Sequence, residues 1–103
     1  MQEIKLNCAK EIKNYQKPSQ PDDNLTSVNG VAWNHCAQFD KQFVTVDEKS
    51  RLMLYDNDRL KAHETIGSGQ LATVSVEPRT GQFILCGGMD TYLALYQINK
   101  KQS

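Results

Sequence analysis

Short segments in which apolar and polar residues alternate dominate the later three quarters of the chain. In residues 51–56, Leu52 and Leu54 fall on one face of an extended chain. Met53 and Tyr55 fall on the opposite face. Strict alternation over four to eight residues is typical of a half-buried β-strand, whereas a helix repeats its apolar positions every three or four residues. This part of the chain is therefore predicted to be all-β.

The predicted strands form two groups that repeat at a nearly fixed distance. The first group contains residues 28–33, 43–46 and 51–56; the second contains residues 71–76, 82–86 and 92–98. Tyr96 follows Tyr55 by 41 residues, and Val76 follows Trp33 by 43. A period of this size, with three strands and a fourth in the connector, is typical of propeller blades. We expect two antiparallel blades, residues 28–60 and 61–103, forming an incomplete propeller.

The first 27 residues have a different, more polar texture and allow two interpretations. Ile4, Cys8 and Ile12 are four residues apart, which suits one face of a short helix. Ile4, Leu6 and Cys8 alternate, which suits a strand instead. Residues 17–24 contain two prolines together with Asp and Asn, which disfavour both helix and ladder. We expect residues 1–27 to be a short irregular or helical segment followed by a Pro-rich loop.

Composition and charge narrow the possible settings. Twelve basic and twelve acidic residues balance to a formal net charge of 0, so no global field would steer the chain toward nucleic acid or a membrane surface. Three cysteines, odd in number and without a CxxC pair, argue against a disulfide-stapled domain. No apolar leader opens the chain, and no apolar run reaches about 18 residues. A cytoplasmic, reducing location without a membrane span is the expectation.

Motifs that could carry chemistry lack the context that they need. Residues 67–72 match the loose pattern G-x-G-x-x-A, but a predicted strand follows where dinucleotide binding requires a helix. We expect a flexible loop between the blades there. His35 and Cys36 are sequence neighbours without a second pair of ligands nearby. We therefore expect no catalytic residue, no cofactor and no metal site, and the chain is not predicted to be an enzyme.

Two stretches carry a resemblance to a known family. Residues 43–56 (FVTVDEKSRLMLYD) end in Tyr-Asp, where WD repeats typically have Trp-Asp. Residues 77–90 (EPRTGQFILCGGMD) resemble the second blade of heterotrimeric G-protein beta subunits, in which a Pro-Ser-Gly turn leads to a Cys-Gly-Gly-Leu-Asp turn. The Gly-His dipeptide of the family is replaced by Asp23-Asn24 and Ile66-Gly67. From about residue 28 to 100 the chain thus resembles the WD-repeat family.

The resemblance implies a non-catalytic scaffold for protein–protein interaction in signalling or complex assembly. The alternative is a structural subunit that retains part of a propeller within a large multi-protein complex. Two blades leave one face of each terminal sheet uncovered, so we expect the chain to need further blades or partner chains.

The resemblance also implies where a partner would bind. In G-protein beta subunits, a Trp and a Met at the start of this blade, and a Leu and an Asn flanking its turn Asp, contact the alpha subunit. The matching residues are Gln70, Ala72, Met89 and Thr91. Gln70 and Ala72 replace the Trp and the Met, which argues against a conventional alpha-subunit contact because aromatic anchors usually supply interface energy.

Four further expectations concern single residues and stripes. Arg51 and Tyr92 occupy equivalent places in their strands and are expected to be exposed on the blades as interaction candidates. Trp33 is expected to pack in the core at a strand end. The stripes expected to pack blade on blade are Val31/Trp33, Phe43/Leu52/Leu54 and Val74/Val76/Ile84/Leu93/Leu95. A charge at Leu93 is then expected to cost several kcal/mol.

Overall fold

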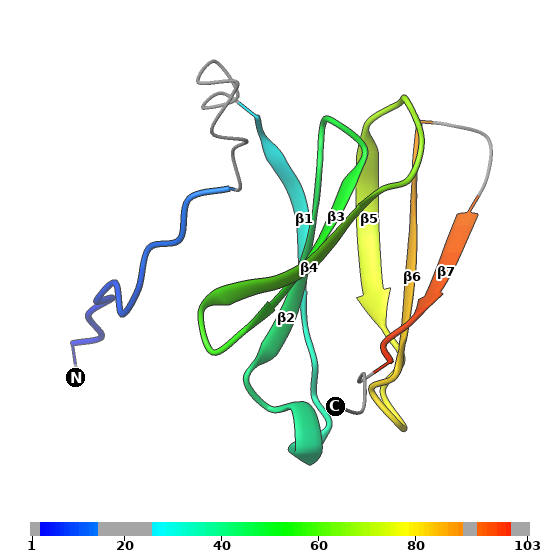
Figure 1. Cartoon of the computed structure of the whole chain (residues 1–103). Helices are drawn as coiled ribbons and strands as arrows, with labels where there is room; N and C mark the ends of the chain where they lie inside the picture. Colours follow the sequence, from blue (N-terminus) through cyan, green and yellow to red (C-terminus); the bar gives the residue numbers. More distant parts are fainter. Residues whose placement is uncertain (1–2, 15–25, 90–92, 100–103) are drawn as a thin grey trace.

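A computed structural model describes residues 3–14, 26–89 and 93–99 as two antiparallel β-sheets (Figure 1). The first sheet has the order β1-β2-β3-β4: β1 (Val28–Trp33), β2 (Gln42–Asp47), β3 (Arg51–Asp56) and β4 (Arg59–Thr65). The second sheet has the order β5-β6-β7: β5 (Leu71–Val76), β6 (Phe83–Gly88) and β7 (Leu93–Gln97). A single 3-10 turn, η2 (Ala37–Phe39), is the only helical element among the described residues. The all-β prediction is confirmed.

The fourth strand of the first sheet lies in the connector, as the repeat predicted. β3 and β4 are joined by Asn57 and Asp58, whose φ angles of 52° and 68° are both positive. A two-residue hairpin loop of this kind favours Asn and Asp, because their short polar side chains tolerate the left-handed region. β4 runs to Thr65 and pairs with β3 along its length. The boundary expected between residues 60 and 61 therefore falls inside β4, and the first sheet extends five residues further.

The two sheets share the same strand register, which shows that the sequence repeat is also a structural repeat. Both first strands carry an irregularity at the same place, between Val28 and Gly30 in β1 and between Leu71 and Thr73 in β5. Cross-strand rows also correspond: Trp33–Phe43–Tyr55 with Val76–Ile84–Tyr96, and Ala32–Val44–Leu54 with Ser75–Leu85–Leu95. The strands β1, β2 and β3 of the first sheet thus have β5, β6 and β7 as their counterparts in the second.

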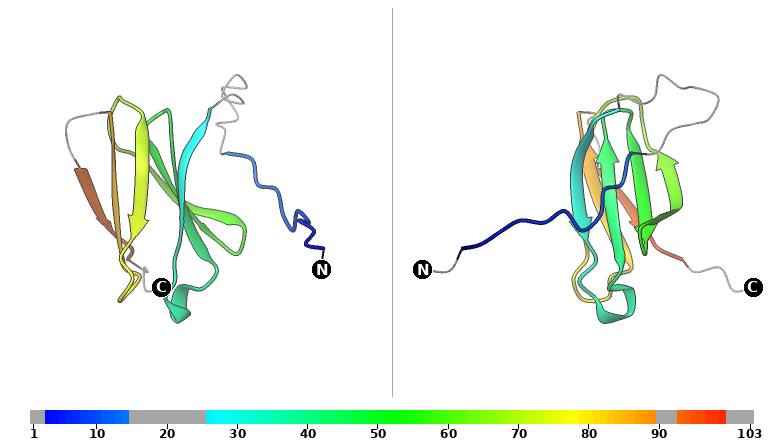
Figure 2. Two further views of the ribbon diagram at one scale, coloured as in Figure 1. Left: turned by 180° about the vertical axis from the view of Figure 1, so that it is seen from behind. Right: turned by 90° about the vertical axis from the view of Figure 1, so that its left-hand side faces the viewer.

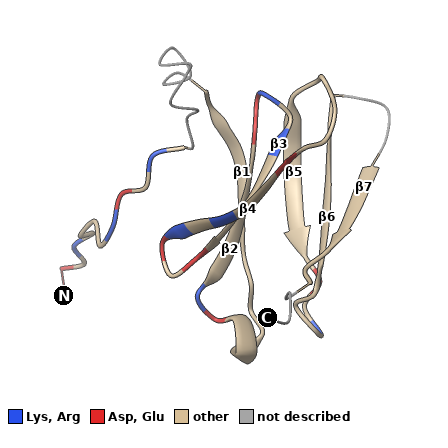
Figure 3. Cartoon of the chain, in the orientation of Figure 1, with Lys and Arg blue, Asp and Glu red and all other residues tan. Residues whose placement is uncertain are grey.

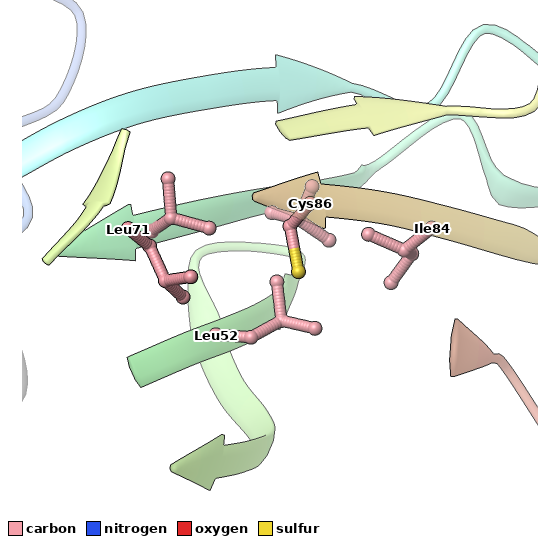
Figure 4. Close-up of a cluster of buried hydrophobic side chains, with 6 residues drawn as sticks. Leu52, Leu71, Ile84 and Cys86 are labelled. Atoms are coloured by element: carbon pink, nitrogen blue, oxygen red, sulfur yellow. The ribbon is translucent and has the colours of Figure 1, made fainter. Parts of the chain in front are cut away.

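The core lies between the sheets, where β5 packs against β1 and β2 (Figures 1 and 2). The buried side chains that meet there are Val44, Val46, Leu52, Leu71, Ile84 and Cys86 (Figure 4). Gly30 permits the close approach: a Cβ on it would lie 3.1 Å from Val46 Cγ2 and 3.5 Å from the Ala72 carbonyl oxygen. The faces that meet here are called the inner faces of the two sheets, and the opposite faces are called the outer faces.

The expected apolar stripes are divided between these faces. Phe43 pairs with Tyr55, whereas Leu54 pairs with Val44, so the stripe Phe43/Leu52/Leu54 is wrong: Phe43 lies on the outer face. Side chains opposite each other in an antiparallel pair point to the same face, and their sequence neighbours point to the other.

Leu93 and Leu95 are also misplaced by the sequence prediction. Leu95 pairs with Leu85 rather than with Ile84, so it lies on the outer face of the second sheet. Leu93 is 71% exposed and Leu95 is 65% exposed. The expectation that they pack between blades is wrong within this chain, and a charge at Leu93 is not expected to cost several kcal/mol in a single copy.

Trp33 belongs to the outer face of the first sheet and is 57% exposed, so the prediction that it packs in the core is wrong. Its ring meets the edge of Phe43 at a centroid distance of 5.4 Å, and Phe43 stacks on Tyr55 at 4.9 Å. These contacts have the edge-to-face and stacked geometries that aromatic pairs favour. The row orients Trp33 without covering it.

Residues 3–14 have no regular secondary structure, which agrees with the irregular alternative for the N-terminal segment. Ile12 and Asn14 lie against the outer face of the first sheet, beside Phe43. Asn14 Nδ2 donates to Asp47 Oδ2 at 3.1 Å, which ties this segment to β2. The predicted Pro-rich loop lies outside the described residues. No helix in the described part of the chain is long and apolar enough to cross a membrane.

Candidate protein-binding site

One end of the molecule gathers most of the residues that the sequence singled out for partner binding. Gln70 directly precedes β5 and Met89 directly follows β6, so antiparallel pairing brings them together. The Met89 N–H donates to the Gln70 carbonyl at 2.9 Å. Gly88 makes this contact possible, because a Cβ on it would lie 2.0 Å from the Gln70 carbonyl oxygen. Only glycine allows these two backbone segments to approach so closely.

The irregularities of the two first strands complete this surface. Ala72 lies in the irregular step of β5 and is exposed. Asn29 lies in the matching step of β1, and its Nδ2 donates to the Leu71 carbonyl at 2.8 Å and to Gln70 Oε1 at 3.4 Å. The four exposed residues Asn29, Gln70, Ala72 and Met89 are called the end patch. The sequence analysis missed Asn29. The signal that could have found it is its position in the first repeat, which is equivalent to that of Ala72 in the second.

Arg51 lies at the same end but does not belong to the end patch. Its side chain is buried, so the prediction that it is exposed is wrong. Arg51 Nε contacts Asp47 Oδ2 at 2.8 Å. Asp47 is fully buried, and its Oδ1 accepts the backbone N–H groups of Lys49 and Arg51, each at 3.0 Å. The carboxylate therefore draws the guanidinium inward. Thr91 and Tyr92, the remaining predicted site residues, lie outside the described residues.

The loop between the sheets is fastened to the first sheet beneath the end patch. Ser50 accepts the N–H of Ile66 with its carbonyl at 2.8 Å, and accepts the N–H of Gly67 with its Oγ at 3.0 Å. Ser50 has a φ of 66°, which turns the chain between β2 and β3. The G-x-G-x-x-A pattern leads directly into strand β5, so this segment is a connection between sheets, as expected. It does not open a helix that could receive a pyrophosphate.

At the opposite end of the sheets, polar groups hold the loops together. Asn34 Nδ2 donates to the Gly81 carbonyl at 2.9 Å, and the Cys36 thiol donates to the Pro78 carbonyl at 3.2 Å. Glu77 accepts the N–H groups of Arg79 and Thr80 and the hydroxyl of Thr80. The Thr80 hydroxyl, followed by the two backbone groups, lowers the pKa of Glu77 below its ordinary value of 4.5. These polar side chains are used for hydrogen bonds that hold the loops and turns.

Buried titratable groups have packing explanations as well. Burial raises the pKa of the Cys86 thiol, which lies in the core between the sheets. Burial also raises the pKa of Tyr55 on the outer face of the first sheet; the Arg51 charge opposes this shift and the Asp47 charge adds to it. Across residues 3–14, 26–89 and 93–99, no group of three His, Cys, Asp or Glu side chains could hold a metal ion.

Comparison with known proteins places the fold. No protein-family model matches the chain, and a comparison with curated proteins finds no match. The chain is similar to the crystal structure of the Myceliophteria thermophila Cps50 (Swd1) β-propeller domain, with a TM-score of 0.66 and 15% sequence identity. The superposition covers 80% of this chain and 26% of that domain. The two sheets therefore have the fold of β-propeller blades, the fold class that the repeat predicted.

Proposed function

We propose that the chain is a non-catalytic scaffold that binds another protein through the end patch. The observation that supports this function most directly is the geometry of Gln70 and Met89. The Met89 N–H to Gln70 carbonyl bond holds the base of a protruding side chain that is 74% exposed. Exposed Met side chains adapt to apolar pockets on a partner. Binding residues held at the ends of packed strands suit the use of rigid propeller frames as interaction surfaces.

The finer proposal is a role like that of G-protein beta subunits in signalling, in a reducing compartment such as the cytoplasm. Its support is the Cys-Gly-Gly-Met-Asp sequence at residues 86–90 and the absence of a disulfide at all three cysteines. Gln70 lacks the aromatic ring of that family's contact. We therefore propose a partner whose apolar pocket receives Met89, rather than one that depends on an aromatic anchor at position 70.

The test starts by identifying the partner with a photo-crosslinking amino acid at position 89 of the full chain. The captured protein is then purified, and its affinity is measured for the wild type, for Met89→Glu and for Ala72→Arg. We expect each substitution to weaken binding at least about tenfold, because each places a charge in a desolvated contact. Lys41→Gln, an exposed position at the other end of the sheets, is the control and should leave affinity unchanged. Equal affinities for all four chains would reject the end patch.

A second function, a structural subunit that is completed by other chains, is favoured by a different observation. The outer face of the second sheet exposes Leu85, Leu93 and Leu95, an apolar surface that a lone protein rarely leaves uncovered. A chain that is stable and monomeric at high concentration, and binds no dye specific for exposed apolar surface, would exclude this function.

A further inference from the structure

The uncovered outer face of the second sheet has the same design as the covered inner face of the first. The covered row Ala32–Val44–Leu54 has as its counterpart the row Ser75–Leu85–Leu95. Leu52, buried in the core, has as its counterpart Leu93, which is 71% exposed. The repeat therefore predicts that this outer face packs against a sheet of the same kind as the second sheet.

The chain carries a surface of that kind on the outer face of its own first sheet. The inner face of the second sheet offers Leu71 and Val74 from β5, with the row Val76–Ile84–Tyr96 beside them. Their counterparts on the outer face of the first sheet are Val28, Val31 and the row Trp33–Phe43–Tyr55. The outer face of the first sheet thus resembles the inner face of the second sheet. It is therefore the kind of surface expected to cover the outer face of the second sheet.

The part of this surface that would make the contact is open. Within the chain, the second sheet approaches the first mainly through β5, the counterpart of β1. On the outer face of β1, Val28 is 47% exposed, Val31 is 65% exposed and Trp33 is 57% exposed. Residues 3–14 border this face: Ile12 and Asn14 line a pocket with Val28 and Val31 of β1, and residues 8–10 and Ile12 line another with Val31 and Trp33. A docked sheet must accommodate that segment while it packs on β1.

Charge also favours this pairing. The strands β1, β5, β6 and β7 contain no Asp, Glu, Lys or Arg. In the described chain, charged residues lie in β2 to β4, in the loops and in residues 3–14 (Figure 3). When the two free faces join, no charged side chain of β1 or of the second sheet has to lose its hydration. Burying an ion usually carries that cost.

We propose that a second copy of this chain stacks head to tail on the first, the outer face of β1 of one copy covering the outer face of the second sheet of the other. The contact is heterologous, so each copy keeps one free face and assembly continues past two until a ring closes or a filament grows. One detail differs from the contact within the chain. The glycine of the row Gly30–Val46–Leu52 lies on the first strand, whereas that of Thr73–Gly87–Leu93 lies on the second. Each face thus keeps one glycine in this row.

Complementary face variants of the full chain test the proposal in sedimentation experiments at rising concentration. Leu93→Glu disables the face on the second sheet, and Val31→Glu disables the face on β1. We expect the wild type to form species larger than a dimer, and each variant alone to associate at least about tenfold more weakly. The two variants mixed have one intact face each and should form a 1:1 heterodimer. Leu95→Glu and Trp33→Glu form a second pair, and Lys61→Gln on β4 is the control that should assemble like the wild type.

Several outcomes would overturn the proposal. A wild type that stays monomeric at high concentration would show that another protein or another sheet covers these faces. Val31→Glu chains that dimerise alone would show a symmetric contact between second sheets instead. A mixture that stays monomeric while the wild type assembles would also contradict head-to-tail stacking. Equal thermal unfolding of the variants and the wild type under monomeric conditions shows that folding is intact. Met89→Glu should assemble normally, which separates this proposal from binding at the end patch.

Discussion

At the scale of single residues, Asp47 organises the end of the first sheet. Its carboxylate accepts the backbone N–H groups of Lys49 and Arg51, Arg51 Nε and Asn14 Nδ2. These contacts close the turn between β2 and β3 and tie the N-terminal segment to the sheet. A buried charge is tolerated when hydrogen bonds and an opposite charge compensate its lost hydration.

Replacing Asp47 by Ala is expected to destabilise the chain by about 3–5 kcal/mol, because it leaves the buried Arg51 guanidinium without its counter-charge. Urea unfolding followed by circular dichroism measures this loss. Asp40→Ala, at an exposed position with ordinary right-handed backbone angles, provides the comparison and should change stability by less than about 1 kcal/mol. A loss at Asp47 as small as that at Asp40 would show that the pair does not stabilise the fold.

Glu77 should make stability depend on pH. Hydrogen bonds from Thr80 and Arg79 lower the pKa of Glu77 in the folded chain below its ordinary value of 4.5. The folded state then binds this proton less readily than the unfolded state, so the contribution of Glu77 is complete above the ordinary pKa. It is lost as the pH falls through the lowered value. Urea midpoints should therefore fall more steeply below pH 4.5 in the wild type than in Glu77→Gln.

An identical acid dependence of the two chains would contradict these hydrogen bonds. A direct check is the carboxyl chemical shift of Glu77, which should titrate with a pKa below the ordinary value of 4.5.

Arg51 shows why residue burial could not be predicted from the sequence alone. Alternation correctly indicated a strand at residues 51–56, but a charged residue at its start suggests an exposed side chain. The partner that buries it is a carboxylate four residues earlier, oriented by the backbone of the turn itself. That orientation depends on the positive φ of Ser50, which no pattern of apolar residues reports.

At the scale of elements, the strands were largely predictable because alternation and turn residues agree. Residues 51–56 and 71–76 coincide with β3 and β5. The repeat also indicated a fourth strand in the connector, although β4 contains only two strongly apolar side chains, Leu60 and Ala62. Pairing with β3 and the Asn57-Asp58 turn form this strand, rather than its own hydrophobic pattern.

The turn between β5 and β6 depends on Gly81, which has a φ of 70°. Its N–H donates to the Glu77 carbonyl at 3.0 Å, and its own carbonyl accepts a hydrogen bond from Asn34 Nδ2, in the loop that follows β1. A Cβ at this position would lie 2.5 Å from Asn34 Oδ1. Gly81→Ala therefore combines backbone strain with a clash, and we expect a loss of about 1–3 kcal/mol in urea unfolding.

The neighbouring exposed residue Gln82 offers a control for Gly81. Gln82→Ala should stay within about 0.5 kcal/mol of the wild type. If Gly81→Ala were equally neutral, the left-handed conformation described at Gly81 would be contradicted.

At the scale of the whole molecule, the repeat was readable but the assignment of faces was not. The offsets between Tyr55 and Tyr96, and between Trp33 and Val76, are reproduced by the strand registers. Both faces of each sheet carry apolar residues, so periodicity alone does not say which face is covered. That choice depends on which sheet comes next in space, and it leaves Trp33, Leu93 and Leu95 exposed in this chain.

The central claim is that the two sheets are consecutive repeats. The inner face of the first sheet is covered, and its counterpart, the outer face of the second sheet, is open. Leu52 and Leu93 are counterparts, the first 5% exposed and the second 71% exposed. Matched Leu→Ala substitutions, compared by urea unfolding at a concentration where the chain is monomeric, test the claim most directly. We predict a loss of about 2–5 kcal/mol for Leu52→Ala and less than about 1 kcal/mol for Leu93→Ala. Equal losses at the two positions would contradict the packing described.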